Sequence, residues 1–491
     1  MTEHGKDGFL SGGEWQGRVF DGQWVQARGG SAEVREPGSG RLLGSVGVAD
    51  ATDIQRACRA AQAAQSGWAA TGARERAAVL RAAAAVFEAR AAEWADLVAR
   101  ETGGILPKGQ HEVREAAALL HAAAGLALHP AGLVLRGLGP KLSYARRVAR
   151  GVVGVISPFN FPLILSMRAV APALATGNAV VLKPDLQTPL AGGFLIARAL
   201  AQAGLPAGVL HVLPGGPQAG EALCQDPCVQ MIQFTGSTAV GRRVAELAGR
   251  GLKKVSLELG GNNALIVLDD ADLDAAVNNA AWGAWLHQGQ ICMAGSRIFV
   301  QASVAAEFTR RLADKARHLP VGDPASGQVA LGPLINERQA TRVRGIVADT
   351  LAAGAKLEAG GGGQGLFHPA TVLSGVVPGM RSFDEETFGP VASVIEFGDD
   401  AQAIELANRH DGALAAAVIS RSVGRAMAIA GRLNAGMVHV NDQTVNDDVT
   451  NPFGGPGVAG AGSSVAGPAD IEEYTRWQWL TIRDQPPTYP F

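Results

Sequence analysis

Val152-Val153-Gly154-Val155-Ile156 begins the stretch of sequence that decides the fold, because it is the first of several short apolar runs. Segments of helical length and composition separate these runs. The runs cover residues 152–156, 179–182, 208–213, 229–234 and 254–257, and the helical segments include 188–203 and 238–250. Strands that alternate with helices predict right-handed βαβ units and a parallel, doubly wound sheet. Ligands of such sheets bind beyond the carboxyl ends of the strands, so we look for chemistry in the residues that follow each run.

Polar residues and glycines occupy those positions. Polar residues follow buried strands in many α/β proteins, so any one of these positions alone is a weak indication. Together they offer an amide, an ammonium group, glycine-rich turns, a hydroxyl at a helix start and a carboxylate, namely Asn160, Lys183, Gly215-Gly216, Thr235-Gly236-Ser237 and Glu258. A dinucleotide and a reaction centre along one edge of the sheet would need such a set.

A second alternating series begins near residue 262 and predicts a second α/β domain. Its strands are expected at 264–268, 297–300, 391–397, 414–419 and 436–440, with helices at 272–286, 303–317, 400–408 and 422–432. Before residue 151 the apolar residues Ile54, Ala57 and Ala61 recur at the helical period. We therefore expect two doubly wound parallel-sheet domains: a dinucleotide-binding domain at 1–127 and 149–258, and a catalytic domain at 259–457.

The tail of the chain, residues 474–482, alternates with period 2 after both domains are complete. A late strand without an obvious sheet of its own suggests pairing across a subunit interface. We expect residues 128–148 and 472–491 to form a small β oligomerisation element, in a homodimer or homotetramer.

Composition excludes several classes of protein. The 491 residues carry 43 basic and 45 acidic side chains, so no excess of positive charge is present to hold a nucleic acid. The four cysteines are too scattered for a secreted scaffold, and Cys224 and Cys228 lack a second ligand pair for zinc, which indicates a reducing cytoplasm and no metal site. Residues 116–135 contain no charged side chain, but Pro130 interrupts them, so we expect a buried helix and a turn and not a membrane span.

Cys292 is the candidate nucleophile, because it lies just beyond a helix in a glycine-flanked loop. A thiolate that attacks a carbonyl needs donors for the developing oxyanion, and the side chain of Asn160 and the backbone N–H of Cys292 are the candidates. Glu258 is the candidate base, since its apolar and glycine neighbours would desolvate it and raise its pKa.

No strand-linked GxGxxG is present, so the ordinary Rossmann phosphate fingerprint is absent. Phe234-Thr235-Gly236-Ser237 opens a helix instead, and its free N–H groups with the Ser237 hydroxyl could bind a pyrophosphate. Serine and threonine are also ordinary helix caps, so this pattern alone leaves both interpretations open.

These residues belong to six motifs that resemble the aldehyde dehydrogenase superfamily in order and spacing, from about residue 20 to the C-terminus. The motifs are Ser157-Pro158-Phe159-Asn160-Phe161-Pro162, Lys183-Pro184, Phe234-Thr235-Gly236-Ser237, Leu257-Glu258-Leu259-Gly260-Gly261, Gly289-Gln290-Ile291-Cys292 and Glu385-Glu386-Thr387-Phe388-Gly389-Pro390.

The resemblance implies a thiohemiacetal on Cys292, hydride transfer to a nicotinamide, and hydrolysis of the thioester by water that Glu258 activates. It also implies that Lys183 binds the adenosine ribose, Ser237 the pyrophosphate and Glu386 the nicotinamide ribose, with Phe388 against the ring. Nothing in the sequence alone singles out Glu386 or Phe388. The full set of cofactor residues that we predict is Ile156, Ser157, Pro158, Phe159, Lys183, Gly215, Phe234, Thr235, Gly236, Ser237, Leu259, Glu386 and Phe388.

Two positions depart from the family pattern. Leu186 stands where NAD-preferring members commonly carry a glutamate that binds the ribose 2′-hydroxyl. Without that carboxylate a 2′-phosphate meets no charge repulsion, so we expect NAD as the cofactor with NADP possible. Phe159 stands where tryptophan is more frequent, which preserves an aromatic wall.

The substrate prediction is an aromatic aldehyde. The C-terminal sequence, from Asn451 through 475–479 to Phe491, is similar to that of family members that act on benzaldehyde, vanillin and salicylaldehyde. Arg168 is an unusual charge in an apolar helix start, and we expect it to pair structurally and not to contact substrate. An apolar tunnel is expected from Phe161, Leu165, Ile291 and Phe453.

Three alternatives stay open at this point. A CoA-acylating dehydrogenase would need no water-activating base, and the presence of Glu258 argues against it. A dehydrogenase of aliphatic aldehydes or semialdehydes would use the same residues. A cysteine-dependent thioesterase or amidase could use Cys292 with His287, but this would leave Lys183 and Ser237 without a role.

Overall fold

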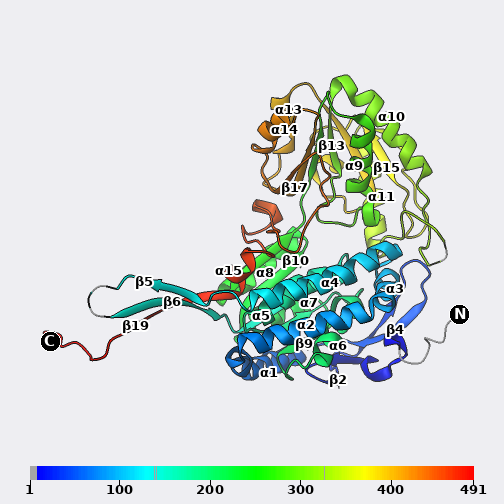
Figure 1. The fold of residues 1–491 in the computed structure, drawn as a ribbon. Coiled ribbons are helices and arrows are strands. Elements are labelled where there is room, and N and C mark those ends of the chain that lie inside the picture. The colour runs from blue at the N-terminus through cyan, green and yellow to red at the C-terminus, as the bar shows by residue number, and fades with distance from the viewer. Residues whose placement is uncertain (1–7, 138, 140, 326) are drawn as a thin grey trace.

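The computed structural model describes residues 8–491 apart from 138, 140 and 326, and two large β-sheets dominate it, one above the other in Figure 1. Residues 1–7 of the predicted first domain lie outside the described residues. The lower sheet has the order β11-β10-β7-β8-β9-β1-β2, and its first five strands are parallel. Its strands are β11 (Lys254–Leu259), β10 (Val229–Gly236), β7 (Val152–Ile156), β8 (Ala179–Lys183), β9 (Leu210–Val212), β1 (Arg18–Phe20) and β2 (Trp24–Gln26). The parallel, doubly wound sheet predicted from the apolar runs is confirmed, and β1 and β2 extend it.

Helices cover both faces of the lower sheet. Val153 and Val155 of β7 pack into one core, with α2 (Ala73–Ala89), α3 (Ala91–Thr102), α4 (Leu106–Leu126), α5 (Pro162–Ala175), η3 (Leu190–Phe194) and α6 (Leu195–Gln202). Val152 and Ile156 face the other core, with α1 (Ala51–Ala70), α7 (Pro217–Gln225) and α8 (Thr238–Arg250). Successive strand residues therefore alternate between two apolar layers, which explains why the strands read as continuous apolar runs.

The upper sheet has the order β14-β15-β16-β13-β12-β17-β18 and is parallel except for β14. Its strands are β14 (Lys356–Ala359), β15 (Thr371–Ser374), β16 (Val391–Phe397), β13 (Arg297–Gln301), β12 (Ala264–Val267), β17 (Ala413–Ile419) and β18 (Ala435–Val440). One face packs on α9 (Leu273–Trp285) and α10 (Ala302–His318), and the other on α11 (Glu337–Ala352), α12 (Arg381–Asp384), α13 (Asp400–Ala407) and α14 (Val423–Ala430). The predicted second α/β series is confirmed, while β14, β15 and α11 had no counterpart in the prediction.

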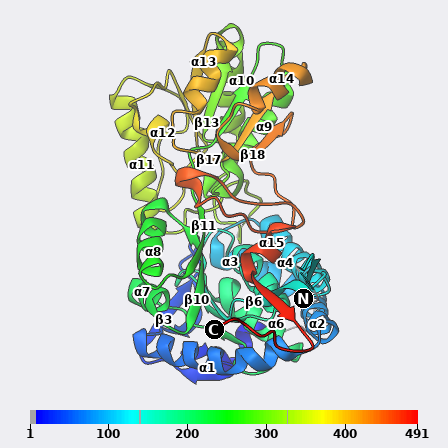
Figure 2. The same cartoon turned by 90° about the vertical axis from the view of Figure 1, so that its left-hand side faces the viewer.

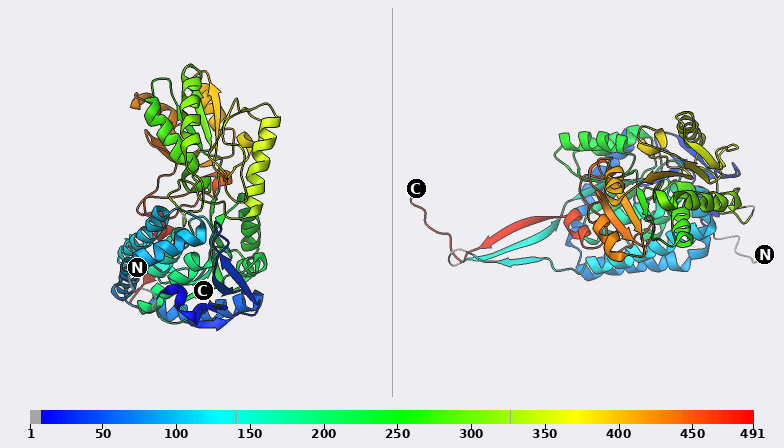
Figure 3. Two further views of the ribbon diagram at one scale, coloured as in Figure 1. Left: turned by 90° about the vertical axis from the view of Figure 1, so that its right-hand side faces the viewer. Right: turned by 90° about the horizontal axis from the view of Figure 1, so that it is seen from above.

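A small antiparallel sheet projects from the body as an arm, seen from the side in Figure 1 and from above in Figure 3. It consists of β5 (Gly132–Leu135), β6 (Leu142–Ala149) and β19 (Thr475–Ile482), and α15 (Ala469–Tyr474) leads into β19. β19 pairs with β6 along its whole length, from Thr475 opposite Ala149 to Ile482 opposite Leu142. The small β element predicted from residues 128–148 and 472–491 is therefore present as a sheet, while its pairing across a subunit interface stays a prediction. The edge of β19 that does not pair with β6 and the faces of the strand are exposed, and the exposed fraction of Trp479 is 66%.

The charge-free stretch at 116–135 divides between two elements. Its first part completes α4, which ends at Leu126, and residues 132–135 form β5. The predicted buried helix and turn are confirmed, but the stretch ends in an exposed strand. No helix in the described part of the chain is long and apolar enough to cross a bilayer. The remaining short elements are β3 (Ser31–Arg35) paired with β4 (Leu42–Gly47), η1 (Phe9–Ser11), η2 (Gly13–Trp15), η4 (Leu286–Gly289) and η5 (Gly457–Ala459).

The two large sheets meet at the carboxyl end of β11. Only residues 260–263 separate β11 from β12, so the chain passes there from the lower sheet to the upper one, near the middle of the molecule in Figure 2. The carboxyl ends of the parallel neighbours β10 and β7 lie beside this crossing. The residues predicted to carry chemistry therefore lie at the junction of the two sheets.

Candidate active site

Cys292 lies on a strained loop between η4 and β13. Three consecutive residues before it have positive φ: 46° at His287, 56° at Gln288 and 66° at Gly289. A side chain at Gly289 would place its Cβ 2.2 Å from the carbonyl oxygen of Gly389, so only glycine fits there. Backbone strain of this kind persists only where the surroundings hold it in place.

Side chains from both domains hold the Cys292 loop. Gln288 Nε2 donates to the carbonyl oxygens of Gly103 and Pro333, each at 3.0 Å. Asn263 Nδ2 donates to the carbonyl oxygen of Cys292 at 2.7 Å, and Asn160 Nδ2 donates to that of Gln290 at 2.9 Å. The position of the thiol is thus fixed relative to β12 and to the end of β7.

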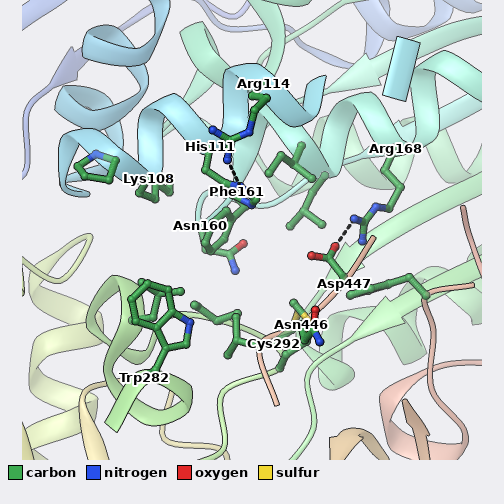
Figure 4. A pocket seen from close by; sticks show the side chains of 18 of the residues that line it. Lys108, His111, Arg114, Asn160, Phe161, Arg168, Trp282, Cys292, Asn446 and Asp447 are labelled. Atoms are coloured by element: carbon green, nitrogen blue, oxygen red, sulfur yellow. Dashed lines mark hydrogen bonds and ion pairs between the residues drawn. The ribbon is translucent and has the colours of Figure 1, made fainter. Parts of the chain in front are cut away.

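A cavity of about 390 Å³ leads to Cys292 from one side (Figure 4). It lies between α4 and α5 of the lower part and residues 282–293 and 445–453 of the upper part. Asn160 and the four predicted substrate residues line it together with Cys292: Phe161, Leu165, Ile291 and Phe453. Its volume suits a ligand of a single ring.

A second cavity, of about 260 Å³, approaches Cys292 from the other side. Asn160, Leu165 and Cys292 line both cavities, so the two meet at the thiol. The second cavity brings together most of the predicted cofactor residues, namely Pro158, Phe159, Thr235, Gly236, Ser237, Leu259, Glu386 and Phe388, and also Glu258.

Five predicted cofactor residues are not part of this lining: Ile156, Ser157, Lys183, Gly215 and Phe234. Lys183 ends β8 and is nine-tenths buried, which lowers the pKa of its ammonium group. Its Cε would lie 3.6 Å from a Cβ at Gly220. The Ser157 hydroxyl accepts a hydrogen bond from that of Ser166 at 2.7 Å and is held within the protein.

Burial dominates the electrostatics at the junction. Burial is the largest cause, and together with the nearby Glu386 and Glu258 it raises the pKa of the Cys292 thiol to about 12, against the lowering effect of Arg168. Burial also raises the pKa of Glu258 well above its ordinary value, against the lowering effect of Arg168. Neither carboxyl oxygen of Glu258 has a hydrogen-bond partner among the described residues.

The Glu386–Phe388 turn is held by α11. Arg342 Nη1 donates to the carbonyl oxygen of Glu386 at 2.9 Å, and Gln339 Nε2 donates to that of Phe388 at 2.8 Å. Phe388 has a φ of 52°, and its ring meets that of Phe159 edge-on with centroids 6.0 Å apart. Burial raises the pKa of Glu386 to about 7.

The second cavity fits the nicotinamide end of a dinucleotide. Glu386 Oε1 is buried without a partner among the described residues, which suits it to accept from ribose hydroxyls. The helix α8 begins after Ser237, whose side chain makes no capping hydrogen bond, so its first N–H groups are available to a phosphate. A Cβ at Gly260 would lie 2.3 Å from Glu386 Oε2, so the glycine there leaves room for the carboxylate.

His287, considered above as a partner of Cys292, is buried against Phe161 with ring centroids 5.3 Å apart. Burial lowers the pKa of His287 well below its ordinary value. It is not among the described residues that line either cavity, so the cavities do not present it to a ligand beside the thiol.

The fold and site are those of one family. Residues 24–480 match the aldehyde dehydrogenase family, and this chain belongs to it. It is 52% identical to a vanillin dehydrogenase from Amycolatopsis sp. over 98% of this chain and 100% of that protein. It is 51% identical to a benzaldehyde dehydrogenase [NAD(+)] from Pseudomonas putida over 97% of this chain and 98% of that protein. A crystal structure of betaine aldehyde dehydrogenase from Staphylococcus aureus in complex with NAD+ superposes with a TM-score of 0.94 at 29% identity, over 97% of each chain.

Several residues of the site were not predicted from the sequence. Gln339 and Arg342 line the second cavity from α11, a helix that was not predicted. Asn263 lines neither cavity but holds the Cys292 carbonyl group, and it follows the Gly260-Gly261 turn. Asp447 lines the first cavity and pairs with Arg168, 279 residues earlier in the chain. The Asn262-Asn263 doublet after a glycine turn was the one local signal among these.

Proposed function

We propose that this chain oxidises an aromatic aldehyde, such as benzaldehyde or a ring-substituted relative, to the carboxylic acid with NAD+ or NADP+. The observation that carries the proposal is the meeting of two cavities at Cys292. One is lined by Phe161, Leu165, Ile291 and Phe453, and the other fits the nicotinamide end of a dinucleotide. The vanillin and benzaldehyde dehydrogenases that this chain resembles support an aromatic substrate.

The first step is attack of Cys292 Sγ on the aldehyde carbon. Because burial and two carboxylates raise the pKa of this thiol to about 12, its proton has to be removed as the S–C bond forms. Water in the junction takes that proton to solvent, and Glu258, which lines the same junction, acts in the later hydrolytic step.

The carbonyl oxygen becomes an oxyanion in this step. One N–H of the Asn160 amide is engaged by the carbonyl oxygen of Gln290 at 2.9 Å, which orients the amide and leaves its second N–H for the oxyanion. The backbone N–H of Cys292 is the second donor.

A nicotinamide dinucleotide in the second cavity would accept the hydride that leaves the thiohemiacetal. Glu386 would hold its ribose, and the α8 N-terminus with Ser237 its pyrophosphate. We propose as cofactor residues Ile156, Ser157, Pro158, Phe159, Lys183, Gly215, Phe234, Thr235, Gly236, Ser237, Leu259, Glu386 and Phe388.

Hydrolysis completes the turnover. Glu258 takes a proton from water as the water oxygen bonds to the thioester carbon and the C–S bond breaks. The burial that raises the pKa of Glu258 makes it a stronger base than an exposed carboxylate.

The cofactor preference follows from Leu186, which is half-buried in the turn after β8. A neutral side chain there does not repel a 2′-phosphate, so both NAD+ and NADP+ should support turnover. Leu186→Glu should lower kcat/KM for NADP+ at least tenfold and leave NAD+ nearly unchanged, while Leu186→Gln controls for size. Equal effects of both substitutions would remove charge as the cause.

We also propose the division of labour along the chain. Residues 1–127 and 149–258 bind the dinucleotide, 259–457 supply the nucleophile, and 128–148 with 472–491 form an oligomerisation element of a homodimer or homotetramer. The exposed Val134 and Trp479 on the arm support this last role. The four free cysteines are consistent with work in the cytoplasm.

A substrate screen tests the proposal. Purified enzyme is given benzaldehyde, vanillin and aliphatic aldehydes with each cofactor, with and without CoA, and products are identified. We expect benzoate and vanillate as products, with higher kcat/KM than for aliphatic aldehydes. A preference for aliphatic aldehydes, acyl-CoA as the main product, or hydrolysis of benzoyl thioesters that needs neither Glu258 nor the cofactor site would each contradict it.

A further inference from the structure

Two side chains of opposite charge face each other in the wall of the first cavity. Figure 4 shows Arg168, from α5, reaching Asp447, from the segment after β18. Arg168 Nη2 donates to Asp447 Oδ2. Only 5% of the Arg168 side chain is exposed, against 24% for that of Asp447. The expectation that Arg168 pairs with a partner is confirmed, and the pair also lines the cavity.

The position of Arg168 is well determined. Its guanidinium carbon lies 4.4 Å from the centroid of the Phe453 ring, and Phe453 is itself part of the lining. Its Nε is buried and has no hydrogen-bond partner among the described residues. Arg168 therefore remains in the cavity wall whether or not Asp447 carries a charge, because packing and the ring hold it there.

Asp447 is the only carboxylate among the described residues that line this cavity. The other cations of the lining have partners outside it. Lys108 Nζ lies 2.5 Å from Glu112 Oε1, and Arg114, which is largely exposed, lies 3.6 Å from Glu115. The charge of Arg168 is thus compensated from within the cavity, by a group that a ligand can contact.

A substrate with its own carboxylate would compete with Asp447 for Arg168. It would meet the Asp447 charge at close range in a site with little water, where like charges repel strongly. An uncharged aromatic ring meets a pair without net charge. Removal of the Asp447 charge would leave the buried Arg168 without its ion-pair partner, which is the situation that favours a new anion.

We propose that Asp447 determines the charge specificity of this cavity: by pairing with Arg168 it excludes aldehydes that carry a carboxylate and admits uncharged aromatic aldehydes. The proposal rests on the proposed function, because it assigns the first cavity to the aldehyde. It makes Asp447 a specificity-determining residue and Arg168 the latent anion-binding group.

The test compares benzaldehyde with 4-formylbenzoate, which differs by one carboxylate, and 3-formylbenzoate covers the other ring position. The measured quantity is the ratio of kcat/KM for a formylbenzoate to that for benzaldehyde. The wild-type ratio should be a tenth or less for both acids. In Asp447→Asn, which keeps the size of the side chain, the ratio should rise at least tenfold for one of them.

Two further variants separate charge from loosening of the site. Asp448→Asn removes the neighbouring carboxylate, which bonds to Thr450 and is not in the described lining, and it should leave the ratio unchanged. Arg168→Gln combined with Asp447→Asn removes both charges, and the gain seen with Asp447→Asn alone should disappear. An unchanged ratio in Asp447→Asn, or a gain that persists in the double variant, would overturn the proposal.

If Asp447→Asn fails to fold, the wild-type enzyme alone still tests the proposal. A wild-type ratio of kcat/KM for a formylbenzoate to that for benzaldehyde near one or above contradicts exclusion by Asp447. If the wild type oxidises none of these aldehydes, the proposed function fails. Binding of benzoate and terephthalate by calorimetry then still tests Asp447, because it needs no turnover. Terephthalate should bind at least tenfold more weakly than benzoate to the wild type, and equal binding would overturn the proposal.

Discussion

Asn160→Ala is the substitution whose two effects the structure separates most clearly. The Asn160 side chain lies where both cavities meet Cys292, and its Nδ2 donates to the carbonyl oxygen of Gln290 at 2.9 Å. Alanine removes that hydrogen bond and also the N–H assigned to the oxyanion. One loss affects stability, and the other affects the rate of acylation.

The magnitudes follow from these contacts. Loss of one oxyanion donor lowers kcat by a factor of roughly 10²–10³, which corresponds to about 2.7–4 kcal/mol of transition-state stabilisation. The carbonyl group of Gln290 lies in a buried residue, and loss of its donor lowers the free energy of unfolding by about 1–3 kcal/mol. The rate effect should appear in the first turnover, because the oxyanion forms before hydride leaves.

The assay is rapid-mixing measurement of nicotinamide reduction with benzaldehyde, beside unfolding by urea. Asn279→Ala is the matched control, since Asn279 Nδ2 also donates to a carbonyl oxygen, that of Ala275 at 2.9 Å, and Asn279 lines neither cavity. It should leave the first turnover unchanged. A first turnover of Asn160→Ala within tenfold of wild type would refute the oxyanion assignment.

Two other predictions concern buried carboxyl groups. In Glu258→Gln the first turnover survives but steady turnover falls by roughly 10²–10⁴. Because burial raises the pKa of Glu258, the wild-type steady rate should fall as pH decreases through that pKa, and a variant that kept the same pH limb would exclude Glu258 as its source. Glu112→Leu removes the partner of the buried Lys108 and the acceptor for the N–H groups of Leu163 and Ile164, so the free energy of unfolding should fall by about 3–5 kcal/mol in urea titrations. Glu115→Leu on the same helix should cost less than about 1 kcal/mol, and equal losses would contradict the account.

Most of the strands that the sequence predicted are buried on both faces, whereas β18 and the tail strand β19 are mostly half-buried or exposed. Each residue of β7 and β8 is buried, so each appears as an uninterrupted apolar run. β14 was missed because its residues Lys356–Ala359 are mostly exposed, and β2 has only three residues without a buried one among them. Strands of this kind are stabilised by their neighbours and leave little local signal.

The strands of the arm also leave little local signal in the sequence. β6 reads Leu-Ser-Tyr-Ala-Arg-Arg-Val-Ala and is mostly half-buried, so its pattern gives neither its bounds nor its register with β19. Residues 128–148 were grouped with the tail, but the pairing of β6 with β19, more than 300 residues apart in the chain, is visible only in the structure.

At the site, the residues directly after strand ends or in a glycine-rich loop could be found. Asn160, Glu258 and Cys292 are of this kind, and the structure brings them to one junction. Asp447 could not be found in this way, because its significance comes from Arg168, 279 residues away, and no periodic pattern links the two. Pairs of this type become visible only when the domains are placed together.

The aldehyde carbon becomes bonded to Cys292 Sγ in the proposed reaction. Mass spectrometry of a trapped intermediate tests this bond most directly. Glu258→Gln enzyme is mixed with benzaldehyde and NAD+, quenched in acid, and digested. A benzoyl thioester is expected on the peptide that contains Cys292. None is expected in the double variant that carries both Glu258→Gln and Cys292→Ala. Absence of the adduct, or an adduct on the partly exposed Cys228 instead, would contradict the account.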